Sequence, residues 1–265
     1  MALFTDGLVS QVSDLIAYEA NLPEVASAEG IDLATKLQLA HTEVGAEITA
    51  ASQRPGNVYF ARGGGWQTSG AEGNYSRFEL SKVVVTPPLS LWHTFQTLAI
   101  VYRDAYNRKL NDKYLPKWKE YKDLAQWASG LLFQTGIGIA SNPVPRPASP
   151  TLDWVASSAA ALAVFVRVTW VGAQGVEGAA SAEQAVTVPV NHSLRVTIGE
   201  APAGVSGWHV YAGSSSGEVF RQNAEALEPG PAWVMPAGGL ISGAAVGDGQ
   251  LPEVFRTVPR FLQRG

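Results

Sequence analysis

The chain contains no cysteine among its 265 residues. This absence excludes disulfide bonds, thiolate nucleophiles and cysteine-ligated zinc. An excess of basic residues is also missing, since the formal net charge is −4 and the pI is about 5.6. Because a dedicated nucleic-acid-binding protein normally presents a basic face, the composition argues against that class. The longest apolar run, residues 159–166, falls far short of the roughly 20 residues of a membrane span, and we expect no membrane partner.

Lysine is absent from the second half of the chain, the last one being Lys122. A stretch with proline at every second or third position, residues 142–150, follows it. Such a segment cannot continue a helix or join a central strand, and it favours an extended spacer. The sequence therefore predicts two bodies, with a helical domain over 1–142, a linker over 143–150, a β domain over 151–252 and a C-terminal tail over 253–265.

Apolar residues at helical spacing predict about four helices in the first body, over residues 5–20, 29–52, 86–110 and 113–134. Pro23 is expected to break the chain between the first two. Thr86 suits the N-cap of the third helix, because the two prolines that follow it are tolerated in a first turn. The first body is therefore expected to be a helical bundle.

A long loop is predicted over residues 54–80, where glycines bracket a short apolar stretch. Loops of this length are uncommon in compact domains and are often functional. Its aromatic residues Tyr59, Phe60 and Trp66 are candidates for binding a partner, because aromatic side chains are common anchors at interfaces. The alternative is a loop that folds back onto its own core.

Beyond Pro150 the period of the pattern changes to two. Alternation over 162–171 places Val164, Val166 and Val168 on one face. Further short strands are expected over 185–190, 194–198, 208–211 and 218–221, separated by glycine turns. Strands at this spacing indicate a β-sandwich or a small barrel. The tryptophans of this half are expected to pack in the core or at an interface.

No catalytic, metal or cofactor site is recognisable in the sequence. The four histidines lack the spacing of metal ligands, and the triple glycine at 63–65 lacks the Lys-Ser/Thr of a phosphate-binding loop. Trp208 and Tyr211 are typical of carbohydrate-binding modules only if their rings are exposed. We expect a non-enzyme without cofactor or metal, and the N-terminus shows no secretory signal.

Two sets of segments carry a resemblance to known proteins. The first set comprises residues 28–37, 83–93, 102–107, 111–114 and 117–121, and it resembles the head–tail connector (adaptor) proteins of tailed bacteriophages. The second comprises residues 166–171, 175–178 and 207–213, and it is similar to the immunoglobulin-like or fibronectin-III domains appended to phage virion proteins. Together the two sets cover both halves of the chain.

The resemblance implies a structural virion protein of α + β type, with an immunoglobulin-like β-sandwich after the helical domain. It implies a ring of identical copies, usually twelve, beneath the portal protein. The ring would contact a tail or neck protein and extend the channel through which DNA passes without specific binding. A tail or baseplate component that binds surfaces or glycans is the first alternative, and a carbohydrate-active enzyme is the second.

A ring subunit also needs arms that reach its neighbours. Besides the loop, the tail is a candidate, because it combines arginines with large apolar residues and follows no domain pattern. Its candidate contact residues are Phe255, Arg256, Arg260, Phe261, Leu262 and Arg264. The alternative for the tail is a frayed terminus.

Overall fold

The computed structural model describes residues 1–53, 78–109 and 112–257. They divide into two compact units, and each unit is built from more than one stretch of the chain. The helical unit comprises Gly7–Ile139 together with the chain from Val254 onward. The β unit comprises Met1–Asp6 and Ala140–Glu253.

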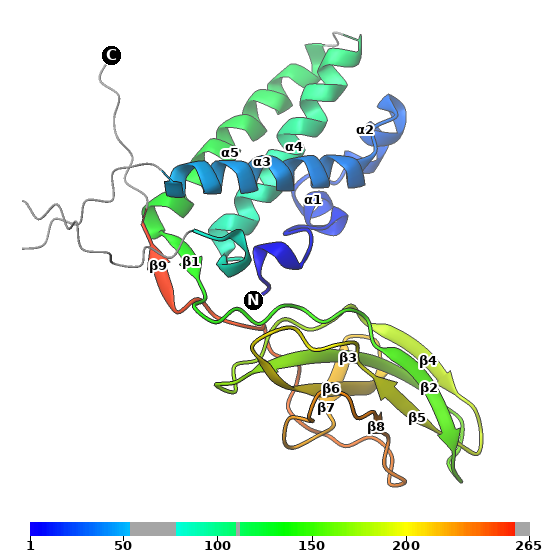
Figure 1. The fold of residues 1–265 in the computed structure, drawn as a ribbon. Coiled ribbons are helices and arrows are strands. Elements are labelled where there is room, and N and C mark those ends of the chain that lie inside the picture. The colour runs from blue at the N-terminus through cyan, green and yellow to red at the C-terminus, as the bar shows by residue number, and fades with distance from the viewer. Residues whose placement is uncertain (54–77, 110–111, 258–265) are drawn as a thin grey trace, which may run out of the picture. The chain divides into compact units, whose positions relative to one another are not determined.

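Within the described residues, five α-helices form the helical unit, where the sequence predicts about four (Figure 1). They are α1 (Val12–Tyr18), α2 (Leu22–Glu29), α3 (Leu33–Gln53), α4 (Pro87–Lys109) and α5 (Leu115–Thr135). The additional helix is α2. Pro23 lies in the first turn of this helix instead of breaking the chain, because the N–H that proline lacks would have no partner in a first turn. Gly30, in the left-handed region at φ 60°, ends α2.

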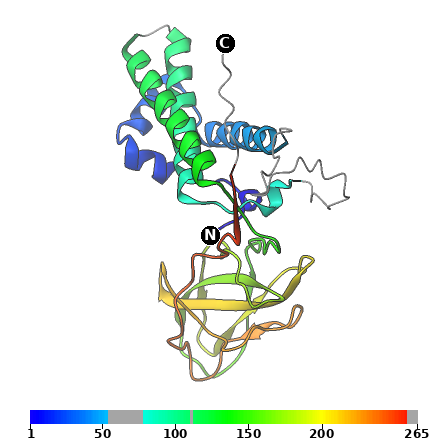
Figure 2. The ribbon, with the colours of Figure 1, turned by 90° about the vertical axis from the view of Figure 1, so that its left-hand side faces the viewer.

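Helix α4 is the centre of this unit. It packs against α1, α2, α3 and α5, and Figures 1 and 2 show α5 running beside it while α3 crosses the pair. Its side chains are buried on most sides, including Leu89, Trp92, Phe95, Leu98, Val101 and Ala105. The two longest amphipathic helices, α3 and α5, therefore lie on different sides of a buried one.

A two-stranded ribbon joins the two ends of the helical unit. Strand β1 (Ile137–Ile139) pairs antiparallel with β9 (Val254–Arg256), and Ile139 lies directly opposite Val254. The sequence predicts a separate tail over 253–265, and its first residues instead form this strand. The β unit is thus inserted between two paired strands, apart from residues 1–6.

This arrangement makes the insertion removable. We expect a chain that starts at Gly7, with residues 140–253 replaced by Asn-Gly, to keep the helical fold, because a two-residue turn closes a hairpin between directly paired residues. The helical core consists of the unit's own residues, such as Leu15, Ile48 and Leu132, all fully buried. Circular dichroism and hydrogen exchange would test this, and loss of cooperative unfolding would contradict it.

Two sheets form the β unit. Their strands are β2 (Thr151–Ala156), β3 (Leu162–Gly172), β4 (Gln184–Val188), β5 (His192–Thr197), β6 (Val205–Ser215), β7 (Glu218–Arg221) and β8 (Trp233–Val234). The orders are β2-β5-β8 and β4-β3-β6-β7. The five strands predicted from alternation are confirmed, whereas β2 and β8 were not predicted.

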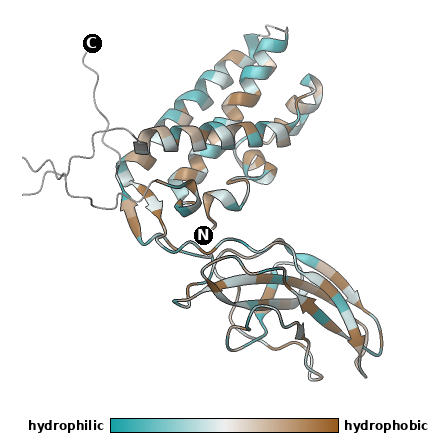
Figure 3. Ribbon diagram, in the orientation of Figure 1, coloured by the Kyte–Doolittle hydropathy of each residue, from teal (hydrophilic) through white to brown (hydrophobic). Residues whose placement is uncertain are grey.

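One core joins the two sheets. Val164, Val166 and Val168 are fully buried in it, as their alternation predicts, and Leu194 and Val196 enter it from the other sheet. Figure 3 shows hydrophobic and hydrophilic residues in turn along these strands.

The proline-rich stretch belongs to the β unit and is not a free spacer. Val144 packs into the core at 3% exposure. Its N–H donates to Gln250 Oε1 at 2.8 Å, and Gln250 Nε2 donates to the Asn142 carbonyl at 2.9 Å. The N-terminal segment is held in the same unit, since Asp6 Oδ1 accepts from the Arg146 N–H at 2.9 Å. The side chains of Gln250 and Asp6 thus fix segments that are far apart in sequence.

Candidate interaction sites

Most of the contact residues predicted from the sequence lie outside the described residues. This holds for Tyr59, Phe60 and Trp66 of the predicted loop and for Arg260, Phe261, Leu262 and Arg264 of the tail. Phe255 and Arg256 are described, and both are part of β9.

Strand β9 makes contacts within the helical unit through Arg256 and exposes apolar surface at Val254 and Phe255. Arg256 lies over the ring of Phe78, 5.9 Å from its centroid, and donates to the Ser52 carbonyl at 3.4 Å. Phe255 lies opposite Gly138 and is 56% exposed, and Val254 is 57% exposed. Of the two predicted contact residues in β9, Phe255 is therefore available for a partner, whereas Arg256 already has contacts within the unit.

A carboxylate network ties α1 to α5. The Tyr121 hydroxyl donates to Glu19 Oε2 at 2.9 Å, and Lys117 Nζ lies 3.0 Å from the same oxygen. Burial alone would raise the pKa of Glu19, but hydrogen bonds from Lys117, Tyr121 and Tyr102 outweigh it, so the pKa is lowered. Tyr102 stacks on Tyr121 with ring centroids 5.6 Å apart. This network is structural, and no signal in the sequence pointed to it.

A second network lies on the outer face of the four-stranded sheet. Glu177 Oε1 accepts hydrogen bonds from Tyr211, at 2.6 Å, and from Thr169. Burial, followed by the bond to Glu177, raises the pKa of the Tyr211 hydroxyl. Tyr211 is 1% exposed and Trp208 is fully buried, so neither ring is available to stack on a sugar. The carbohydrate-binding interpretation of these two residues is wrong.

Two histidines meet where α3 packs on α4. The rings of His41 and His93 lie 5.8 Å apart, edge to face, and His93 is fully buried. Desolvation, with a contribution from His41, lowers the pKa of His93 to about 4. His93 is therefore packed inside the unit, with the partly buried His41 ring against it.

The buried imidazole makes the helical unit sensitive to acid. Below pH 6.5 the unfolded chain binds a proton that the folded chain excludes until about pH 4. The contribution of His93 to the free energy of unfolding is therefore fully present above pH 6.5. It falls by roughly 2–3 kcal/mol between pH 7.5 and pH 4.5. Urea unfolding of the wild type and of His93→Gln at both pH values measures the difference. Equal losses in the two proteins would refute the assignment.

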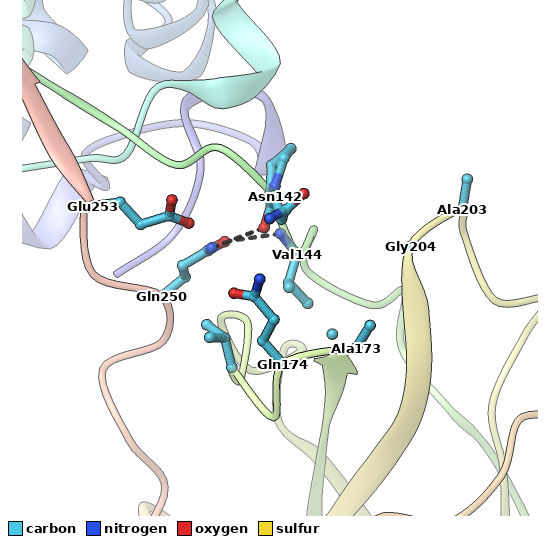
Figure 4. Close-up of a pocket in the computed structure, with 11 residues that line it drawn as sticks. Asn142, Val144, Ala173, Gln174, Ala203, Gly204, Gln250 and Glu253 are labelled. Atoms are coloured by element: carbon cyan, nitrogen blue, oxygen red, sulfur yellow. Dashed lines mark hydrogen bonds between the residues drawn. The ribbon is translucent and has the colours of Figure 1, made fainter.

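A shallow pocket of about 290 Å³ lies at one end of the β unit. Figure 4 shows Gln250 directed toward Asn142 and Val144, with Gln174 and Glu253 nearby. Its most buried polar side chain, Gln250, is already engaged by backbone groups of the unit. The pocket thus lacks a converging set of unused polar groups.

Neither a metal centre nor a membrane span is found in the described part of the chain. Within residues 1–53, 78–109 and 112–257, no group of three or more His, Asp or Glu side chains could hold a metal ion. None of the helices described there is long and apolar enough to cross a bilayer.

Comparisons of this chain with family models, with curated proteins and with solved structures find no match.

Proposed function

We propose that this protein is a head–tail connector of a tailed bacteriophage, a structural virion component whose helical unit forms a ring under the portal. The observation that carries the proposal is the placement of the residues behind the resemblance. Segments 28–37, 83–93, 102–107 and 117–121 all belong to one unit, on α2 to α5 and the approach to α4. A ring subunit needs two unlike side faces, and α3 and α5 on different sides of α4 supply them.

The β unit supports the second half of the proposal. Its pairings, β2 with β5 and β4-β3-β6-β7 in order, correspond to the B–E pair and the C′-C-F-G sheet of immunoglobulin-type sandwiches. One core joins both sheets, and Trp208 is one of its fully buried members. We assign this unit to the immunoglobulin-like or fibronectin-III-like class, lacking the first strand, A.

The charge of the chain suits a conduit for DNA. Up to Pro150 there are thirteen Lys and Arg against fourteen Asp and Glu. Multiple Lys and Arg contacts to phosphates would hold the duplex and slow its passage. A channel wall without a basic excess allows DNA to slide through.

Electron microscopy of the purified protein tests the ring directly. We expect closed rings of a single size, about twelve copies, and co-purification with portal-containing heads. A strictly monomeric protein that does not bind such heads would refute the proposal.

The tail can be tested separately. The chain truncated after Thr257 keeps β9, which truncation after Pro252 would remove. We expect the shorter tail to lower occupancy on portal-containing heads with little change in thermal midpoint. Wild-type occupancy would mean that residues 258–265 are not an arm.

A further inference from the structure

Strand β2 is the edge of its sheet and has backbone groups without a neighbouring strand. It pairs only with β5 among the described strands. The Ser157 N–H donates to the Asn191 carbonyl at 2.8 Å, in the register that continues the β2–β5 ladder. The odd-numbered residues of β2 therefore face β5, and the N–H and C=O groups of Leu152, Trp154 and Ala156 face outward.

Trp154 is the largest exposed side chain on this edge. It lies directly opposite Leu194, which is fully buried in the core, so both side chains belong to the core face of the sheet. Trp154 is nevertheless 43% exposed. The described structure places no strand beside β2 to cover it, at the position that strand A occupies in an immunoglobulin-type sheet.

The side chain of Asp153 already accepts a hydrogen bond from one of the outward N–H groups of this edge. Its Oδ1 accepts from the outward N–H of Trp154 at 2.7 Å, and its Oδ2 forms an ion pair with Arg195 of β5. Such side-chain caps are one way in which proteins blunt a sheet edge. An incoming strand must therefore compete with Asp153 for the Trp154 N–H.

The sequence of β2 is complementary to itself. In an antiparallel pair with Trp154 opposite Trp154 of a second copy, Leu152 faces Ala156 and Asp153 faces Val155. No like charges oppose each other, because Asp153 is the only charge in the strand, and the strand contains no proline. The two tryptophans would cover each other, which aromatic cross-strand pairs favour.

We propose that the β2 edge pairs with the β2 edge of a second copy of this chain, about a two-fold axis at Trp154, in competition with the Asp153 cap. The contact is independent of the proposed ring, because a two-fold contact uses the same patch on both copies and cannot close a ring. It joins chains in pairs through their β units.

Two substitutions with opposite expected effects test the competition. Asp153→Ala removes the cap and is expected to tighten the pairing ~10-fold, since an incoming strand then displaces only water from the Trp154 N–H and no longer competes with a charged acceptor. Ala156→Pro removes only an outward N–H at an exposed position. This substitution is expected to weaken the β2–β2 pairing by a similar factor. Analytical ultracentrifugation of the full chain measures both, and absence of either change would overturn the proposal.

A cross-linking experiment locates the contact whether or not rings form. The chain has no cysteine, so a single introduced thiol reports only on its own position. Trp154→Cys is expected to form a disulfide between copies under mild oxidation, because directly hydrogen-bonded residues lie about 5.5 Å apart between Cα atoms. Ala156→Cys is the matched control, since its equivalents lie too far apart to bridge.

The two outcomes of cross-linking are decisive. Cross-linking of Trp154→Cys alone, in ring-forming and ring-free preparations alike, supports the β2 pair. Equal cross-linking of both variants, or of neither, would overturn it. Failure to form rings leaves this result unchanged, so the proposed function and the β2 contact are judged separately.

Discussion

Substitution of Gly213 by alanine is expected to destabilise the β unit strongly while the stability of the helical unit stays unchanged. Gly213 is buried on β6, in the irregular stretch where β6 pairs with β7. A Cβ at this position would overlap the Glu218 carbonyl oxygen, which belongs to the backbone and cannot turn away. We expect a loss of at least ~3 kcal/mol, because relief requires a shift of the β7 backbone.

A matched control is available in the same unit. A Cβ at Gly199 would meet no atom within 4 Å, and its φ lies outside the left-handed region. Gly199→Ala is therefore expected to change stability by less than about 0.5 kcal/mol. Urea unfolding and hydrogen exchange resolved by unit measure both variants. Wild-type protection of the β strands in Gly213→Ala would contradict the prediction.

Replacement of Glu19 by alanine is expected to produce the largest loss in the helical unit. The Tyr121 hydroxyl, on a side chain that is 3% exposed, would lose its acceptor, and Lys117 would lose its partner. Leaving buried hydroxyls without a partner costs about 1–3 kcal/mol each, so we expect a loss of roughly 3 kcal/mol. Most of it comes from the tyrosines, because Lys117 is 44% exposed and contributes little.

The partner residues give the control for this experiment. In Tyr121→Phe the hydroxyl is removed together with its need for an acceptor, so its loss is expected to be smaller than that of Glu19→Ala. Thermal and urea unfolding measure the two variants. A Glu19→Ala protein as stable as the wild type would show that the network contributes nothing to the fold.

Elements with a strong local pattern could be predicted from the sequence. The helical spacing of apolar residues over 86–110 predicts a helix, and α4 confirms it. The alternation of Val164, Val166 and Val168 predicts a buried strand face, and all three are fully buried. In both cases the period of apolar residues alone decides which face turns inward.

Elements that depend on distant partners were missed. Strand β9 exists because β1 offers it a partner, and its three residues carry no period of their own. A proline such as Pro23 is compatible with a break in the chain or with the first turn of a helix. The structure shows the helix, and α2 packs against α4. Tyr211 gave no sign of burial, because a ring on a strand can face either a core or water, whereas the packing expected for Trp208 is confirmed by its place in the core.

The sequence by itself determined the helical character of the first half, the strands of the second and the absence of cysteine chemistry, since these follow from composition and from local periodicity. Only the tertiary structure decided that the β unit is inserted between β1 and β9, that Val144 and Gln250 lock the proline-rich stretch to that unit, and that Trp154 lies at an open sheet edge. Each of these depends on pairing between segments far apart in the chain. Such pairing is decided by which surfaces remain to be covered once the local elements have formed, and no short stretch of sequence carries that information.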